Sequence, residues 1–132
     1  MNIQLKEWRV KNLSCASKQE EMIDVPSDDN KKFQLSFGHA FSNENAKEFF
    51  LGFKIGIVEK TFDLELEIIF VFETDSEIDE GFKDSAFLKI NAPAIAFPYI
   101  RSYISNLTLQ SGYPPIILPS INFVALNESK NN

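Results

Sequence analysis

Apolar and polar residues alternate along three segments of this chain, and each segment predicts a β-strand. The clearest one runs from Glu59 to Glu73, where even-numbered apolar residues from Phe62 to Phe72 share one face and acidic residues share the other. The segments Phe33–Phe41 and Phe49–Ile57 repeat this alternation. Such a pattern is typical of an antiparallel sheet with one face packed and the other in water.

The first segment, Ile3–Ala16, alternates in two phases. Ile3 and Leu5 are odd-numbered, whereas Trp8 and Val10 are even-numbered, so we expect a β-bulge near Lys6 and Glu7 that re-aims the side chains. Three clusters of turn-forming or charged residues separate the predicted elements: Pro26–Lys31, Ser42–Asn45 and Asp75–Asp84. The sequence thus predicts a meander-like, four-stranded antiparallel sheet.

After the charged cluster the apolar period changes to three and four residues, which predicts a helix. The helix opens at Ala92 and Pro93, where the missing proline N–H is harmless, and its body runs from Ala94 to Ser111. Pro98 is expected either to bend this helix or to mark its start, because an interior proline removes a hydrogen bond. Gly112 is predicted to end it. The fold class is therefore α+β, with one long C-terminal helix.

The length of 132 residues fits one domain, and a domain of this size buries roughly 65–70% of the surface of its unfolded chain. We expect a single domain over residues 1–126 and a frayed C-terminal tail over residues 127–132. The N-terminus has no signal-peptide pattern. Proline and polar residues interrupt the uncharged runs, so no membrane insertion is expected and the expected localisation is cytoplasmic.

Charge and rare residues exclude several functions. The net charge is −6, and Thr61–Asp84 alone holds nine acids and one lysine. An acidic patch argues against nucleic-acid binding and suits a basic protein partner. One cysteine, Cys15, and one histidine, His39, exclude an intramolecular disulfide and make a structural zinc site implausible. Both are interpreted as structural residues, and no metal site or cofactor is expected.

An enzyme is the weakest class of function for this sequence. The sequence contains no nucleophile-elbow motif whose serine could act together with His39. The carboxylates Asp63, Glu65 and Glu67 share one strand face, where a solvated outer surface is the preferred interpretation, because a catalytic pair also needs a desolvating cleft. Catalysis by His39 or by this stripe is kept as a third hypothesis.

Aromatic residues are abundant, with 13 Phe, 3 Tyr and 1 Trp. A phenylalanine-rich core accounts for the inward strand positions. The remaining apolar residues exceed what four strands and one helix can cover, and surplus apolar surface indicates oligomerisation, binding of apolar polypeptide, or both. The candidate residues of an apolar binding groove are Phe37, Phe50, Phe53, Tyr99, Tyr113, Ile117 and Phe123.

Three motifs lie near the C-terminus: FPYIR at Phe97–Arg101, GYPP at Gly112–Pro115, and PSINFVAL at Pro119–Leu126. Together they resemble the signature of the SecB family of bacterial export chaperones. The resemblance implies a four-stranded antiparallel sheet with a helix beside it, assembled as a tetramer (a dimer of dimers) whose grooves hold unfolded preproteins. It further implies that the helix lies at subunit interfaces, and that the acidic face of Asp63, Glu65 and Glu67 docks the translocation ATPase.

Members of this family carry a second helix and an acidic tail after the last motif, whereas only six residues follow Leu126 here. We therefore expect no second helix, and a dimer is the alternative to the tetramer. The leading hypothesis is an ATP-independent holdase for protein export. The alternative is an adaptor of the same fold dedicated to one partner, such as an antitoxin.

Overall fold

The computed structural model describes residues 1–18 and 32–131, which form two compact units. Lys6–Phe72 make up the first, here called the sheet unit, and Met1–Leu5 with Glu73–Asn132 make up the second, the helical unit. The turn predicted at Pro26–Lys31 lies outside the described residues. The expectation of one domain over residues 1–126 stays a prediction.

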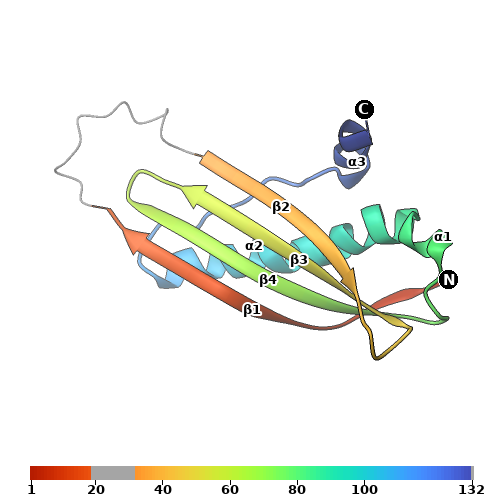
Figure 1. The fold of residues 1–132 in the computed structure, drawn as a ribbon. Coiled ribbons are helices and arrows are strands. Elements are labelled where there is room, and N and C mark those ends of the chain that lie inside the picture. The colour runs from red at the N-terminus through yellow and green to blue at the C-terminus, as the bar shows by residue number, and fades with distance from the viewer. Residues whose placement is uncertain (19–31, 132) are drawn as a thin grey trace. The chain divides into compact units, whose positions relative to one another are not determined.

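Four strands form one sheet in the order β1-β4-β3-β2 (Figure 1). Their bounds are β1 (Ile3–Ser17), β2 (Lys32–Phe41), β3 (Glu48–Val58) and β4 (Phe62–Thr74). Strands β2 and β3 are antiparallel, and Gly38 lies opposite Gly52 in their register. At the junction of β3 and β4, the Glu59 N–H donates to the Phe62 carbonyl over 2.9 Å. The predicted strands are thus confirmed.

Strand β1 lies beside β4, which corrects the meander-like order expected from the sequence. Hydrogen bonds from Lys18 N–H to the Thr61 carbonyl (2.8 Å) and from Asp75 N–H to the Asn2 carbonyl (3.1 Å) join opposite ends of the two strands. The pairing is therefore antiparallel. Only β2, β3 and β4 form a meander, because short turns join them, whereas the longer stretch between β1 and β2 does not force these two strands to be neighbours.

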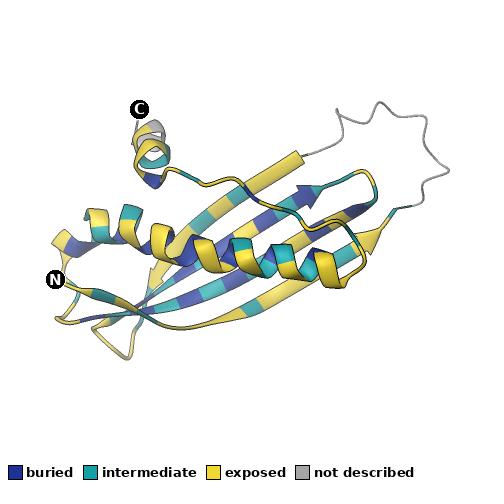
Figure 2. Cartoon of the chain, turned by 180° about the vertical axis from the view of Figure 1, so that it is seen from behind, coloured by how far each residue is buried: buried dark blue, intermediate teal, exposed yellow. Residues whose placement is uncertain are grey.

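One face of β3 and β4 is buried along its whole length. The even-numbered residues of β4 from Phe62 to Phe72 are apolar and at most 2% exposed, and the alternation shows in Figure 2. The rings of Phe49 and Phe72 stack with centroids 5.1 Å apart, and those of Phe53 and Phe70 meet edge to face at 5.8 Å. These cross-strand aromatic pairs stabilise the sheet beyond the burial of area alone.

The exposure pattern of β1 has the predicted change of phase and a second one. Ile3 and Leu5 are half-buried, and the next half-buried residues are Val10 and Cys15. Residues on one face of a regular strand differ by even numbers, so each step of five residues changes the parity of the half-buried positions. Such irregularity is common in edge strands, where it discourages pairing with other chains.

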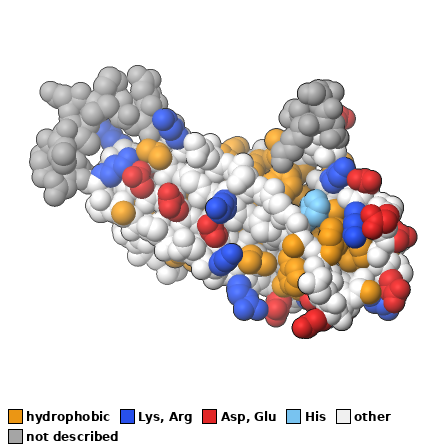
Figure 3. Space-filling model, viewed as in Figure 1, with side chains coloured by type: hydrophobic (Ala, Val, Ile, Leu, Met, Phe, Trp, Pro, Cys, Tyr) orange, Lys and Arg blue, Asp and Glu red, His pale blue; other side chains and the backbone are white. Residues whose placement is uncertain are grey.

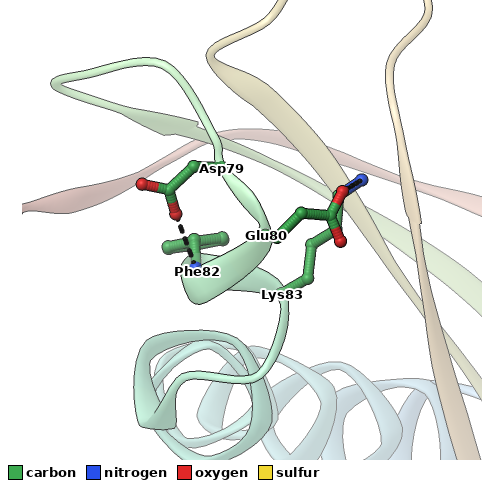
Figure 4. A network of polar contacts seen from close by, with 4 residues as sticks. All are labelled: Asp79, Glu80, Phe82 and Lys83. Atoms are coloured by element: carbon green, nitrogen blue, oxygen red, sulfur yellow. Dashed lines mark hydrogen bonds and ion pairs between the residues drawn. The ribbon is translucent and has the colours of Figure 1, made fainter.

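The helical unit begins after β4 with a short helix, α1 (Glu80–Lys83). Asp79 caps it by accepting a hydrogen bond from the Phe82 N–H at 2.8 Å, and Lys83 lies 3.3 Å from Glu80 (Figure 4). The cluster predicted as a charged loop thus contains one helical turn. A π-helical turn, η2 (Phe87–Asn91), leads directly into the long helix.

The long helix α2 spans Ala92–Gln110 and continues through Pro98, so Pro98 does not mark its start. Pro98 and Ala94 are both exposed, so water can bond the Ala94 carbonyl that Pro98 leaves without a donor. Gly112 ends the helix as predicted, with φ of 95°. Its N–H donates to the Leu109 carbonyl, and the Tyr113 N–H donates to the Thr108 carbonyl, which is the Schellman pattern.

A further helix, α3 (Phe123–Asn131), corrects the expectation that no second helix follows α2. Asn122 begins it, because its side-chain oxygen accepts a hydrogen bond from the Ala125 N–H at 3.1 Å. The Phe123 ring meets the Phe97 ring edge to face at 5.8 Å. A helix of nine residues is marginal by itself, so this tertiary contact supports it. No helix within residues 1–18 and 32–131 has the length and apolarity needed to cross a bilayer.

Replacing Leu66 with Ala should lower the free energy of unfolding by about 2–5 kcal/mol, because Leu66 is 1% exposed and its loss leaves a cavity. The matched control is Glu65→Ala, next to it on the exposed face of β4, which should change stability by less than about 0.5 kcal/mol. Urea unfolding at one fixed protein concentration measures both. Equal effects of the two substitutions would contradict the one-sided burial of β4.

Candidate functional site

Two of the candidate groove residues meet on the buried face of the sheet. Phe37 of β2 lies opposite Phe53 of β3, and their ring centroids are 5.5 Å apart. Phe53 is 2% exposed, whereas Phe37 is half-buried. Phe50 lies on the opposite face of β3, since buried positions of this strand are the odd-numbered ones. The three residues therefore do not line one groove within the sheet unit.

The apolar face of β2 stays partly open, in contrast to the same face of β3. Leu35, Phe37 and Phe41 are half-buried and Phe33 is 37% exposed. We call these four residues the β2 strip. Because β2 is an edge strand, it has a neighbouring strand on one side only. The strip therefore continues the buried face of β3 as an accessible apolar surface.

In the helical unit, the other candidates lie on α2, on α3 and on the extended chain between them. Tyr99 is 45% exposed, Ile117 is 79% exposed, and Phe123 is 4% exposed. Tyr113 is half-buried. Phe123 packs on Phe97 in the interior of this unit. Ile117 is the most accessible large apolar residue of this set, so it is the strongest candidate for direct contact with a ligand.

The extended chain between α2 and α3, Tyr113–Asn122, is here called the exit segment. Its exposure changes sharply at successive residues: Ile116 is half-buried, Ile117 is exposed and Leu118 is buried. The guanidinium Nε of Arg101 on α2 donates a hydrogen bond to the Leu118 carbonyl at 3.1 Å. The exit segment is thus attached to α2 while Ile117 projects into solvent.

One face of α2 is exposed and carries no charged residue. Its members are Ala94, Ile95, Pro98, Tyr99, Ser102, Asn106 and Leu109. Ile95 is 38% exposed and Leu109 is 56% exposed. An accessible helix face of small and apolar residues is a feature of protein interfaces. Tyr99 belongs to this face.

The three carboxylates of the predicted docking face lie together on the outer side of β4, but cations neutralise two of them. Asp63 forms an ion pair with Lys18 at 2.8 Å, and Glu67 forms one with Lys54 at 3.4 Å. Glu65 is exposed. Figure 3 shows basic and acidic side chains interspersed on this view of the molecule. The acidic stripe is therefore weaker electrostatically than its sequence indicates.

Two shallow hollows, of about 340 and 320 Å³, lie on the sheet unit, and Ser36, Lys54 and Glu67 line both. The second hollow includes Gly38 and Gly52, which are directly opposite each other in the register. A Cβ atom added at either glycine would meet nothing within 4 Å. The hollow thus exists because two side chains are missing from neighbouring strands.

The structure does not bring His39 and the carboxylate stripe together. His39 follows the alternation of Phe37 and Phe41, whereas Asp63 and Glu67 lie on the other face of the sheet. No cluster of three His, Cys, Asp or Glu residues able to hold a metal ion occurs among the described residues. Burial raises the pKa of the Cys15 thiol, which lowers its thiolate fraction and its reactivity.

The β2 strip cannot be recognised from the sequence, because Phe33 and Leu35 alternate with polar residues as buried strand residues do. The helix start at Asn122 was missed, although an asparagine directly before an apolar run is a recognised helix-start signal. The hydrogen bond from Arg101 to the exit segment had no signal in the sequence, since it joins residues 17 positions apart.

The sheet order, the long helix and the exit segment together define an α+β protein with accessible apolar surface beside a well-packed core. A family model described as "Preprotein translocase subunit SecB" matches residues 1–132. The chain therefore belongs to the SecB family, and the predicted family and fold are confirmed.

Curated relatives agree with this assignment. A protein-export protein SecB of Dinoroseobacter shibae is 37% identical over 87 residues, which cover 61% of this chain and 49% of the relative. One from Ruegeria pomeroyi is 31% identical over 113 residues, covering 81% of this chain and 66% of the relative. The chain thus spans about half to two thirds of the length of these relatives.

Two solved structures share the fold. A SecB-like chaperone of Mycobacterium tuberculosis, in complex with a peptide from an antitoxin, has a TM-score of 0.62 and 17% identity, with 90% of this chain and 87% of that chain covered. A protein of unknown function from Streptococcus agalactiae has a TM-score of 0.59 and 18% identity, with 91% and 98% covered. At these identities the likeness shows the fold alone.

Proposed function

We propose that this protein is an ATP-independent holdase that binds unfolded polypeptides for export. The observation that carries the proposal is the family match over residues 1–132. The exposed apolar residues support it, because a client with no fixed sequence can be held by burial of apolar area at ~25 cal/mol per Å². No catalytic step is part of this function. Preproteins are available before translocation, so the proposed location is the cytoplasm.

Client contacts are proposed on two surfaces, one in each unit. In the sheet unit they are the β2 strip, with Phe37 at its centre and Phe53 supporting it from β3. In the helical unit they are Tyr113 and Ile117 of the exit segment, with Phe123 as buried support. Phe50, on the other face of β3, is proposed as a secondary contact. Tyr99, which is 45% exposed, is proposed as another, at the rim of the α2 face that is proposed below for assembly.

Assembly and partner docking are proposed on further surfaces. The uncharged face of α2 is proposed as a subunit interface of a tetramer or a dimer. The outer carboxylates Asp63, Glu65 and Glu67 are proposed to dock the translocation ATPase, and Glu65 should contribute most, because Lys18 and Lys54 already neutralise its neighbours.

A second candidate function is an adaptor for a single partner. It is favoured by the M. tuberculosis chaperone of the same fold, which is in complex with a peptide from an antitoxin. Client range separates the two candidates. A general holdase should slow the aggregation of several unrelated unfolded proteins at stoichiometric amounts, whereas an adaptor should protect only one.

Replacing Ile117 with Ser should weaken the binding of an unfolded client roughly tenfold. The Ile117 side chain is 79% exposed in the free protein, so the substitution removes the apolar area that it could bury against the client. Val124→Ser is the matched control, since Val124 is 47% exposed on α3 and is not assigned to a client surface. Fluorescence anisotropy with a labelled, permanently unfolded polypeptide measures both. Equal losses would mean that binding is diffuse apolar adhesion.

Introducing a charge at Leu109 should reduce the molecular mass of the assembly. Leu109→Glu places a carboxylate on the uncharged face of α2, where burial of an unpaired charge opposes association. Asn43→Glu adds the same charge in the turn between β2 and β3 and should leave the mass unchanged. Light scattering at micromolar concentration gives the mass, and a monomeric wild-type protein would contradict the proposed assembly.

Reversing the charge at Glu65 should weaken docking of the translocation ATPase by about 1 kcal/mol, roughly fivefold, and reduce its salt dependence. Glu44→Lys makes the same charge change in the turn after β2 and serves as control. Titration of the purified ATPase at two salt concentrations measures the effect. If Glu65→Lys binds like the wild type while Glu44→Lys does not, the docking face lies elsewhere.

A further inference from the structure

The exit segment has no regular backbone pairing that explains its fixed course. Residues 114–122 belong to no helix or strand, and Pro114, Pro115 and Pro119 have no N–H to donate. A segment of this kind would ordinarily be flexible, and a client that bound it would have to order it first. Its course must therefore be set by contacts with its surroundings.

Thr108 on α2 makes the first of these contacts. Its side chain is 0% exposed, and its hydroxyl lies 2.8 Å from the Ile104 carbonyl and 3.1 Å from the Ser105 carbonyl, to which it can donate. The same oxygen accepts a hydrogen bond from the Ile116 N–H at 3.0 Å. The Thr108 carbonyl also accepts from the Tyr113 N–H at 3.0 Å. Thr108 thus holds the exit segment at two residues.

Arg101 makes the second contact, about two turns earlier on the same helix. Its Nε donates to the Leu118 carbonyl at 3.1 Å, and the Leu118 side chain is 3% exposed. Ile117 therefore lies between two residues whose backbone polar groups are both bonded to side chains of α2. Its own side chain is 79% exposed.

We propose that Thr108 and Arg101 are positioning residues that fix the backbone on both sides of Ile117 and so pre-organise this side chain for client contact. The proposal rests on the proposed holdase function and deepens it. A rigid apolar contact costs less ordering on binding than a mobile one, so it gains affinity without any new contact to the client. Neither Thr108 nor Arg101 needs to touch the client.

The test is a double-mutant cycle between Thr108 and Ile117. Thr108→Val keeps the shape of the side chain but removes the acceptor of the Ile116 N–H, and Thr108→Ser restores it. With a reduced, carboxymethylated and therefore permanently unfolded polypeptide as the probe, Thr108→Val should weaken binding about threefold to tenfold. Thr108→Ser should bind nearly as the wild type does.

The cycle separates positioning from general destabilisation. In the Ile117→Ser background, Thr108→Val should cause no further loss, because the contact that it positions is already absent. Amide hydrogen exchange at Ile116 should rise in Thr108→Val and not in Thr108→Ser. An equal loss of affinity in both backgrounds would overturn the proposal, as would faster exchange at Ile116 with unchanged affinity.

If Thr108→Val does not fold, Arg101→Met provides an independent test. It removes the bond to the Leu118 carbonyl and should show the same dependence on Ile117. The outcomes also distinguish the holdase function from the positioning role. A wild-type protein that binds no unfolded polypeptide overturns the holdase function and this proposal together. A wild type that binds through Ile117, but is insensitive to both Thr108→Val and Arg101→Met, overturns the positioning role alone.

Discussion

The structure depends on the burial of one continuous apolar face across β3 and β4. Every second residue from Phe49 to Ile57 and from Phe62 to Phe72 is apolar and almost inaccessible to water, and the aromatic pairs Phe49–Phe72 and Phe53–Phe70 join the two strands across this face. Because the side-chain period of a strand is two, a slip of one residue would expose the whole set. The register between β3 and β4 is therefore strongly specified, and β1 and β2 flank this central pair.

The edge strands β1 and β2 are more exposed to solvent than β3 and β4. On β2 the same alternation continues, yet Phe33 is 37% exposed and its apolar neighbours are only half-buried. On β1 the phase of the half-buried residues shifts twice, which makes that edge irregular. One edge thus keeps an accessible apolar strip of regular geometry, and the other is interrupted. The edge with the accessible strip, β2, is the one that is proposed to contact unfolded chains.

The C-terminal region is ordered mainly by side chains. The Schellman turn at Gly112 directs the chain back along α2, and bonds from Thr108 and Arg101 hold residues that proline-rich sequence would leave mobile. Phe123 then docks on Phe97 and allows a helix of nine residues to form. Each step depends on a residue of α2. The same helix therefore holds the exit segment and presents an exposed, uncharged face.

The four strands, the long helix, its glycine end and the family could all be predicted from the sequence, because they depend on local periodicity, backbone preference and short motifs. Three other features arise only in the folded chain: β1 pairs with β4, Lys18 and Lys54 neutralise Asp63 and Glu67, and α3 forms. The fold also separates the groove candidates into accessible Ile117 and buried Phe53 and Phe123. These features join residues far apart in the chain, and the exposure of an apolar side chain depends on what lies next to it in space, which periodicity does not encode.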